Sequence, residues 1–255
     1  MGLTDKRVVV TGSTRGIGLA IAKEFLTEGA LVAIHGKNPD RLRDAEEMLE
    51  AFGHVLPILS DISTEEGITH LFEEVDSVFK GVDILVNNAA LHEASSVSNA
   101  GWDAWERTIH ANLRSVVMSS QLAFERMKNQ HYGVVINASS FAACVPALPY
   151  GIYSSIKSSV LTLTRILAAE FAPWNIRVNA YIPGSIATDM NKGFVEKGNH
   201  SAVDPIALGR FGTAEEVAAP IVFLSSGKAS YITGAALEIS GGKFTVQNPA
   251  SAWTD

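Results

Sequence analysis

A tyrosine and a lysine four residues apart could act together as a proton donor and its activating cation. They are Tyr153 and Lys157 in YGIYSSIK (150–157), where an amphipathic helical pattern begins, so both side chains share one helix face. A phenol has a pKa of about 10 and is a weak acid–base catalyst at neutral pH, but a nearby ammonium lowers that pKa. This spacing predicts Tyr153 as the catalyst and Lys157 as the group that lowers its pKa. Tyr150 precedes the helix, and we expect it to shape a pocket.

A glycine-rich turn follows the first apolar run of the chain and opens an amphipathic segment. It reads TGSTRGIGLAIAKEF and carries Gly12, Gly16 and Gly18. Glycines permit a tight turn and allow the backbone to approach a pyrophosphate at a helix N-terminus. The motif therefore favours a dinucleotide-binding turn over a plain turn at a helix start.

The end of the second apolar run indicates which dinucleotide the chain selects. A carboxylate there accepts hydrogen bonds from the ribose 2′-hydroxyl of NAD, whereas a cation accommodates the 2′-phosphate of NADP. The stretch LVAIHGKN contains no acid but contains Lys37, and Arg15 in the glycine turn adds a second cation. These cations favour NADP(H) as the cofactor. NAD(H) remains the alternative, in which Lys37 is a solvated lysine at a strand end.

The apolar runs that carry these residues predict the fold class. Seven of them are predicted strands, at 7–12, 31–36, 55–61, 83–90, 133–139, 176–184 and 235–242. Amphipathic segments predict helices at 16–28, 40–52, 64–79, 103–130, 152–171 and 214–225. The strand runs are continuous rather than alternating, which is typical of a parallel sheet buried on both faces. We therefore expect an α/β fold with a doubly wound parallel sheet in one domain, residues 1–255. Residues 189–208 are a predicted substrate lid, and 243–255 form a tail.

Composition excludes several classes of function. The 255 residues carry a net charge of −7, and a nucleic-acid-binding surface needs a basic excess. No apolar stretch is long enough for a signal peptide or a membrane span. A single cysteine, Cys144, and scattered histidines predict neither a disulfide nor a metal site. We expect a cytoplasmic protein that binds neither nucleic acid nor membranes.

Several short motifs occur together in one order along the chain. They are TGSTRGIG, Asp61 after the third strand, NNAA, Asn112 seven residues after Trp105, INASS, YSSIK and IRVNAYIPGSIAT. In this order the chain resembles the short-chain dehydrogenase/reductase (SDR) family, from about Lys6 to Gly242. The resemblance implies a Rossmann fold and hydride transfer between a nicotinamide and a carbonyl or secondary alcohol.

The resemblance also implies a role for individual residues. Tyr153 is the general acid/base, and Lys157 lowers its pKa and holds the nicotinamide ribose. Ser140 hydrogen-bonds the substrate oxygen, and Asn112 binds a water in a proton relay. The implied cofactor-binding residues are Gly12, Thr14, Arg15, Gly16, Ile17, Gly18, Lys37, Asp61, Ile62, Asn88, Ala89, Ala90, Tyr153, Lys157, Pro183, Gly184, Ile186 and Thr188. The structural alternatives are a polar mid-helix residue for Asn112 and a strand-end cap for Asp61.

The identity of the substrate is less closely defined. Among the segments expected around the pocket, His92, Cys144 and Tyr150 are candidate substrate contacts, although His92 could equally be a solvated loop residue. A ketone, a 3-oxoacyl group or a sugar would suit this mixture of apolar and polar pocket residues. Gln130 and Trp174 stand where the resemblance to carrier-protein reductases would place arginines, which argues against a carrier-protein substrate.

Other readings of the whole chain stay open beside the NADPH-dependent reductase. The main alternative is an NAD-dependent alcohol, polyol or sugar dehydrogenase, and a more remote one is a non-catalytic NADPH-binding regulator. The resemblance implies a homotetramer, and we expect Trp253 of the long C-terminal tail to pack on a neighbouring subunit.

Overall fold

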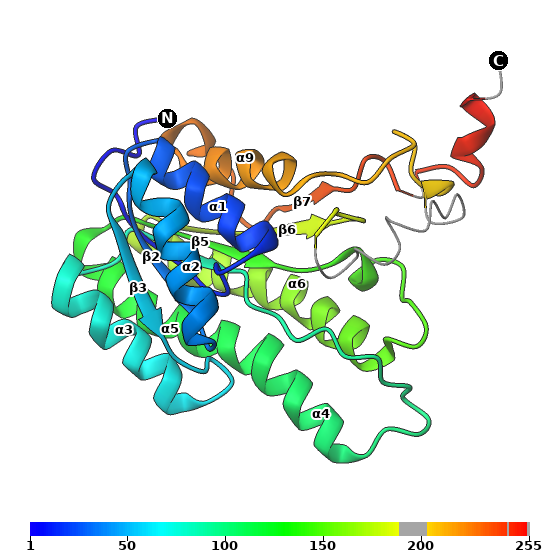
Figure 1. Ribbon diagram of the computed structural model, residues 1–255, viewed down its shortest axis with the longest axis horizontal. Coiled ribbons are helices and arrows are strands. Elements are labelled where there is room, and N and C mark those ends of the chain that lie inside the picture. The colour runs from blue at the N-terminus through cyan, green and yellow to red at the C-terminus, as the bar shows by residue number, and fades with distance from the viewer. Residues whose placement is uncertain (189–202, 244, 254–255) are drawn as a thin grey trace.

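One parallel sheet organises the protein, as Figure 1 shows. The computed structural model describes residues 1–188, 203–243 and 245–253. Its strands are β1 (Arg7–Val10), β2 (Leu31–Gly36), β3 (Val55–Leu59), β4 (Ile84–Asn87), β5 (Gly133–Ala138), β6 (Ile176–Pro183) and β7 (Ala236–Ile239). They pair in the order β3-β2-β1-β4-β5-β6-β7. The seven predicted strands and the doubly wound α/β class are confirmed.

Helices cover both faces of this sheet. They are α1 (Gly16–Thr27), α2 (Pro39–Leu49), α3 (Glu65–Phe79), α4 (Trp102–Ile109), α5 (Ser115–Met127), α6 (Gly151–Phe171) and α9 (Ala214–Ser225). Helices α1, α2 and α9 share one buried apolar cluster with the sheet, and α3, α5 and α6 share another. Among the described residues, no helix is both long enough and apolar enough to cross a membrane.

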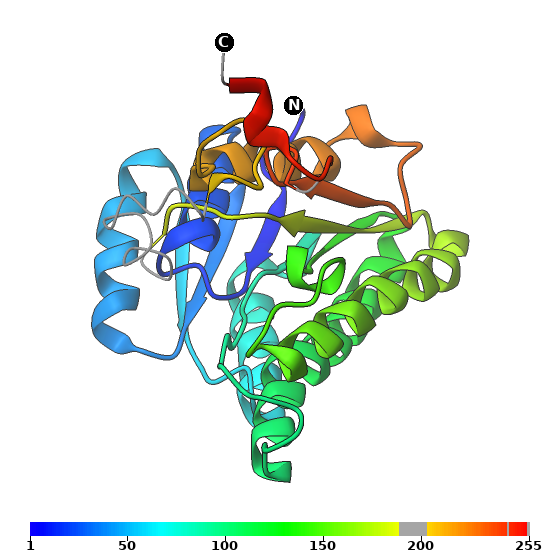
Figure 2. The same cartoon turned by 90° about the vertical axis from the view of Figure 1, so that its right-hand side faces the viewer.

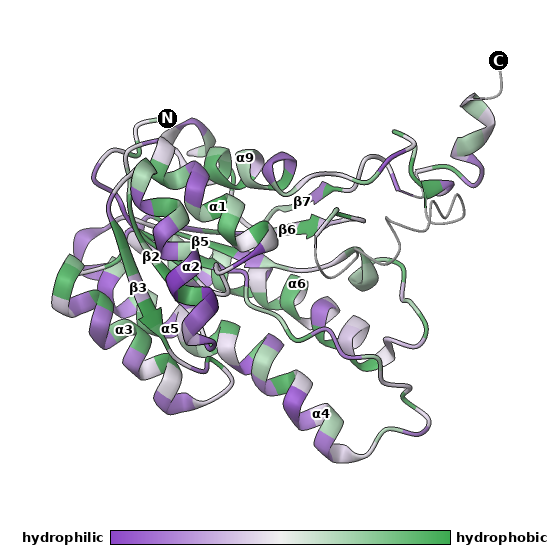
Figure 3. Cartoon of the chain, in the orientation of Figure 1, coloured by the Kyte–Doolittle hydropathy of each residue, from purple (hydrophilic) through white to green (hydrophobic). Residues whose placement is uncertain are grey.

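The two-sided core explains why the strand sequences are continuously apolar. Successive side chains of a strand point to opposite faces, so Val8 and Val10 of β1 enter the α1 layer while Val9 enters the α3 layer. All three valines are fully buried. Figure 3 shows the contrast between these mainly hydrophobic strands and the outer helices, along which hydrophilic and hydrophobic residues are mixed.

The long helix predicted at 103–130 is interrupted in the structure. A π-helical turn at His110–Arg114 separates α4 from α5 and contains Asn112. Single π-helical turns widen the helix locally and often occur at functional sites. The apolar period continues through the turn, which is why the sequence alone predicted one helix.

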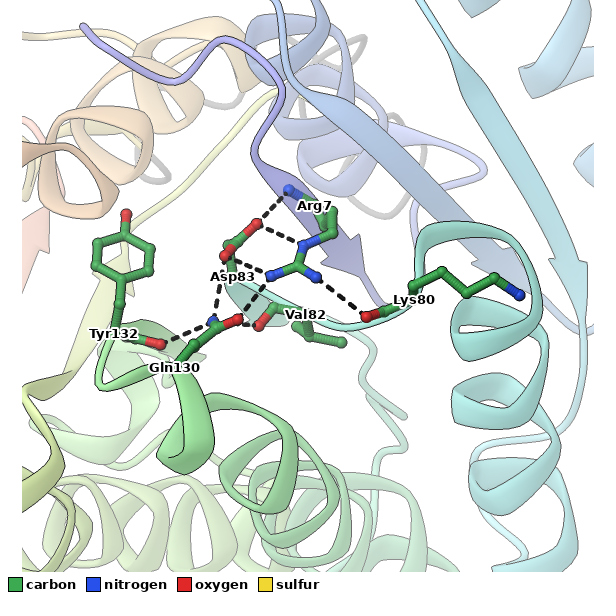
Figure 4. A network of polar contacts seen from close by, with 6 residues as sticks. All are labelled: Arg7, Lys80, Val82, Asp83, Gln130 and Tyr132. Carbon is green, nitrogen blue, oxygen red and sulfur yellow. Dashed lines mark hydrogen bonds and ion pairs between the residues drawn. The ribbon is translucent and has the colours of Figure 1, made fainter.

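A polar network joins strands at the edge of the sheet where the strands begin (Figure 4). The Arg7 guanidinium donates to both carboxylate oxygens of Asp83, at 2.8 and 2.9 Å, and to the side-chain oxygen of Gln130 at 2.7 Å. Gln130 in turn donates to the backbone oxygens of Val82 and Tyr132. Gln130 therefore has a structural role at the edge opposite the strand ends that carry the expected site.

The C-terminal segment folds back on its own chain. Residues Pro249–Trp253 form a 3₁₀ helix, which lies at the periphery of the molecule in Figures 1 and 2. The Trp253 indole N–H donates to the carbonyl of Ala207 at 3.0 Å, and the ring lies against Gly209. The expected contact of Trp253 with a neighbouring subunit stays a prediction. Of the predicted lid at 189–208, residues 189–202 lie outside the described residues.

Candidate active site

A large cavity opens at the carboxyl ends of the strands. Its volume is about 1010 Å³, and it extends over the turns that follow β1, β2, β4, β5 and β6. The strand order reverses between β1 and β4, and ligands of doubly wound sheets bind at such a switch point. All eighteen predicted cofactor-binding residues lie in its wall, together with Ser140 and His92.

The glycine turn is shaped by close backbone approaches. Gly12 and Gly16 have φ values of +64° and +55°, which side chains other than glycine rarely adopt. A Cβ on Gly18 would lie 2.2 Å from the Gly12 carbonyl oxygen and 2.5 Å from the Asn88 amide nitrogen. Gly12 and Gly18 are therefore required for this turn to pack against the end of β4, and Gly16 is required for its left-handed backbone conformation.

Helix α1 presents its N-terminus to the cavity without a side-chain cap. Its N-cap residue, Arg15, makes no side-chain capping hydrogen bond, and no acidic residue stands in the first turn. By contrast, Asn38 and Thr64 cap α2 and α3 through their side chains. First-turn N–H groups carry partial positive charge, so the end of α1 fits the pyrophosphate of a dinucleotide.

His35, which the sequence analysis overlooked, supports this turn from β2. Its ring accepts a hydrogen bond from Gly12 N–H at Nδ1 (3.1 Å), and its Nε2 lies 3.0 Å from the carbonyl oxygen of Ser60. These partners require a neutral ring with the proton on Nε2. Burial lowers the pKa of His35 to about 4, despite the opposing effects of the Ser60 carbonyl and the Asp61 charge. The sequence feature that could have identified His35 is the presence of a histidine within an otherwise apolar, buried strand.

Cations gather where β2 and β3 end. Lys37 and Arg15 both line the cavity there, as predicted, and Arg41 of α2 joins them. Asp61 lies beside Lys37, with 3.9 Å between Nζ and Oδ2. Burial would raise the pKa of Asp61, but hydrogen bonds from Ser63 and the charge of Lys37 outweigh it and hold the pKa below its usual value. Arg41 could not be placed at the cavity from the sequence, because its position there depends on the docking of α2.

The floor of the cavity joins β1, β4 and β6. The Asn88 amide donates to the carbonyl oxygens of Thr11 and Gly12, both at 2.9 Å. Its oxygen accepts a hydrogen bond from the buried Tyr181 hydroxyl at 2.8 Å. Asn88 therefore holds the glycine turn through its amide nitrogen and is itself anchored to β6 through its oxygen, and Ala89 lies directly against Gly12.

Tyr153, Ser140 and Lys157 meet at the other end of the cavity. Tyr153 and Ser140 line the same part of the cavity, where the Ser140 hydroxyl acts to lower the pKa of Tyr153, and Ser140 accepts from the Ala142 N–H at 3.2 Å. The Lys157 ammonium lies 5.7 Å from the centroid of the Tyr153 ring and donates to the Ala138 carbonyl at 2.8 Å. Ser139 instead donates to the Lys157 carbonyl, a structural contact.

The pKa of Tyr153 differs from the sequence expectation. Burial raises the pKa of Tyr153 above its ordinary value, and the hydrogen bond from Ser140 only partly opposes that effect. Burial also lowers the pKa of Lys157 to about 8. Low polarity disfavours phenolate and ammonium alike, so Tyr153 is protonated at neutral pH and is suited to donate a proton.

Asn112 lies behind the cavity rather than in its wall. Its side-chain nitrogen donates to the carbonyl oxygens of Leu91 and Thr108, at 3.0 and 3.1 Å. Its side-chain oxygen accepts from the Leu91 N–H at 3.2 Å. The side chain is fully buried and clamps the segment after β4 to the π-helical turn.

The three predicted substrate contacts have different positions. His92 lines the cavity, with its ring edge-on to Tyr153 at 4.8 Å between centroids and stacked on Tyr150 at 4.2 Å. Tyr150 therefore supports His92 from outside the described cavity wall. Cys144 is exposed on the turn after Phe141 and lies outside the described cavity wall, so its contact with the substrate stays a prediction.

No three His, Cys, Asp or Glu side chains of the described chain are grouped as metal ligands. The reactive end instead consists of hydroxyl, imidazole and ammonium groups around one cavity.

Comparisons with known proteins agree with this geometry. A family model described as Enoyl-(Acyl carrier protein) reductase matches residues 12–243. The chain is 37% identical to a 3-oxoacyl-[acyl-carrier-protein] reductase of Aquifex aeolicus, covering 95% of this chain and 98% of the relative. It is 36% identical to an L-rhamnose 1-dehydrogenase (NAD(P)(+)) of Azotobacter vinelandii, covering 96% and 98%. L-sorbose reductase from Gluconobacter frateurii, solved with NADPH and L-sorbose, has a TM-score of 0.91 at 32% identity, covering 96% of this chain and 99% of that one. The chain belongs to the short-chain dehydrogenase/reductase family of oxidoreductases, which use a nicotinamide cofactor.

Proposed function

We propose that this protein is an NADPH-dependent reductase of a ketone, sugar or 3-oxoacyl carbonyl. The observation that carries the proposal is that Ser140, Tyr153 and Lys157 line the same cavity as the open N-terminus of α1. The relatives named as 3-oxoacyl, rhamnose and sorbose enzymes support this range of substrates.

The reaction needs proton transfer and charge stabilisation from the chain itself. The nicotinamide supplies the hydride when bound, and the protein orients it. Ser140 and Tyr153 stabilise the negative charge that develops on the substrate oxygen, and Tyr153 delivers its proton. The raised pKa of Tyr153 keeps that proton in place at neutral pH. Lys157 would hold the nicotinamide ribose, and its charge favours loss of the phenol proton during the step.

Arg15, Lys37 and Arg41 support a preference for NADPH. They line one end of the cavity, and a 2′-phosphate adds negative charge that NADH lacks. Asp61 beside Lys37 is the observation that favours the second candidate, an NAD-dependent dehydrogenase, because a carboxylate weakens phosphate binding.

Fluorescence titration with NADPH and NADH in parallel tests the cofactor. We expect tighter binding of NADPH, and we expect Arg41→Ala to reduce NADPH affinity about tenfold while changing NADH affinity little, since one charge-assisted contact is lost. Arg43→Ala is the control, because Arg43 pairs with Asp40 on an exposed part of α2. Equal affinities in the wild type would favour the NAD-dependent dehydrogenase.

Replacement of Tyr153 by phenylalanine tests catalysis. Tyr153→Phe should abolish carbonyl reduction and leave NADPH binding largely intact, because only the proton donor is removed. Turnover and NADPH affinity would be measured on the same preparation. Loss of both would show that Tyr153 serves the structure, and unchanged turnover would leave a different proton donor to be found.

A further inference from the structure

The cavity is strongly positive in a chain that is acidic as a whole. Six cationic side chains line its described wall, against two carboxylates, although the net charge of the chain is −7. The cations are Arg15, Lys37, Arg41, Arg107, Lys157 and Lys243, and the carboxylates are Asp61 and Glu93. A cleft lined by one sign of charge concentrates ligands of the opposite sign. A dinucleotide accounts for the cations at the α2 end, Lys157 would hold its ribose, and Arg107 is paired with Glu93 and Asp103, so Lys243 requires a separate explanation.

Lys243 is the cation that the proposed chemistry does not use. It follows β7 through Gly241 and Gly242, whose φ values of +66° and +74° turn the chain over the end of the sheet. The Lys243 N–H donates to the Ser240 hydroxyl at 3.1 Å, and its backbone pairs with Ile206 in an antiparallel bridge. These contacts hold the residue in a defined position beside the cavity.

The Lys243 side chain reaches the reacting end of the cavity. Its ammonium donates to the Ser185 hydroxyl at 2.9 Å and lies 5.3 Å from the centroid of the Phe141 ring. Phe141 and Ser185 line the same cavity as Ser140 and Tyr153, so the ammonium lies in the wall that a substrate would contact. The side chain is half-buried, and burial lowers the pKa of Lys243. An ionic contact made there is screened less by solvent than one on the open surface.

We propose that Lys243 and Ser185 bind a carboxylate of the substrate, so that the enzyme acts on an oxo acid and its hydroxy acid. This inference rests on the proposed reductase function and names its substrate class. An ammonium and a hydroxyl 2.9 Å apart can each donate to one oxygen of the same carboxylate. One ammonium balances a single negative charge, whereas a phosphate monoester carries about −1.5 to −2 at neutral pH.

The carboxylate remains chemically unchanged in this proposal. Hydride reaches the carbonyl carbon, and Tyr153 donates the proton to the carbonyl oxygen. The ionic contact to Lys243 fixes the orientation of the acid, and the Glu93–Arg107 pair, with 2.8 Å between its charged atoms, lies on the same cavity wall. Polar groups there suit the hydroxyls of a hydroxylated acid.

Kinetics with acids and their methyl esters test the proposal. For oxo acids of four to six carbons, the ratio of kcat/KM for acid to that for ester should fall about 10- to 100-fold in Lys243→Met. Lys243→Arg should retain most of the preference for the acid over the ester, because arginine keeps the positive charge. Lys228→Met is the control, since Lys228 is exposed on the turn after α9. Calorimetric titration of the wild type and Lys243→Met with a hydroxy acid, with and without NADP⁺, measures binding independently of turnover.

Each result has a separate meaning for the two proposals. Weaker binding of the hydroxy acid in Lys243→Met supports the carboxylate site, even if no reduction is detected and the reductase proposal fails. An acid-to-ester ratio near one in both proteins overturns the carboxylate site and leaves the reductase standing. If Lys243→Met loses affinity for NADPH while its acid-to-ester ratio of kcat/KM is unchanged, Lys243 belongs to the cofactor site. That result also overturns the carboxylate site. A preference for phosphorylated ketoses that depends on Lys243 would overturn the choice of carboxylate.

Discussion

Acid should weaken the fold through one buried histidine. His35 accepts a hydrogen bond from the glycine turn at Nδ1 and lies against the Ser60 carbonyl at Nε2, so the folded state holds it neutral. A proton on Nδ1 would remove the acceptor for Gly12 N–H and place a charge in the core beneath the dinucleotide turn. Lowering the pH therefore acts on the stability of the protein at the base of its cofactor site.

The size and sign of the effect follow from the two pKa values of His35. The ordinary pKa of 6.5 applies to the unfolded chain, whereas burial lowers it to about 4 in the fold. Between these values the unfolded state binds a proton and the folded state does not, so stability is present above pH 6.5 and falls as the pH drops toward 4. Each pH unit is worth about 1.4 kcal/mol, which gives a loss of about 2 kcal/mol from pH 7 to pH 5.

Urea unfolding at pH 7 and pH 5 measures this loss. His35→Asn removes the titrating group but can still accept from Gly12 N–H, so its free energy of unfolding should fall about 2 kcal/mol less than that of the wild type. His70→Asn is the control, because His70 is exposed on α3. Carboxylates remote from His35, such as Asp83, titrate alike in all three proteins, so the comparison isolates His35 and its interaction with Asp61. Equal losses in wild type and His35→Asn would refute the reasoning.

Three further predictions concern the turn, the sheet edge and catalysis. Gly18→Ala should abolish dinucleotide binding in a fluorescence titration, since its Cβ would meet the Gly12 oxygen at 2.2 Å, whereas Gly227→Ala, with nothing within 4 Å, should be neutral. Arg7→Met should lower the free energy of unfolding by about 1–3 kcal/mol in urea, because it leaves the Asp83 carboxylate without its guanidinium, and adding Asp83→Asn should restore part of the loss. The rate of carbonyl reduction should decline as the pH rises through about 8, where Lys157 loses its proton. A stopped-flow pH profile without a break in that range would contradict the assigned role of the lysine.

Local patterns in the sequence determined most of the fold. Continuous apolar runs such as 7–12 and 31–36 predict strands buried on both faces, and each of them is a strand of the sheet. The glycine spacing and the Tyr153–Lys157 pair are equally local, because a turn and one helix face each involve only a few consecutive residues. Most of the predicted cofactor residues closely follow strands, and parallel strands bring their carboxyl ends to one edge of the sheet, which is why these residues line a common cavity.

Tertiary packing decided the features that depend on distant segments. His35 supports Gly12 only because β2 pairs with β1, and Arg41 and Lys243 line the cavity only because α2 docks on the sheet and the chain turns back after β7. Packing also reversed one expectation: a lysine on the same helix face suggested a lowered pKa for Tyr153, but burial raises it. Sequence spacing states which residues are neighbours along a helix, whereas the free energy of a charge depends on how much water the rest of the chain excludes around it.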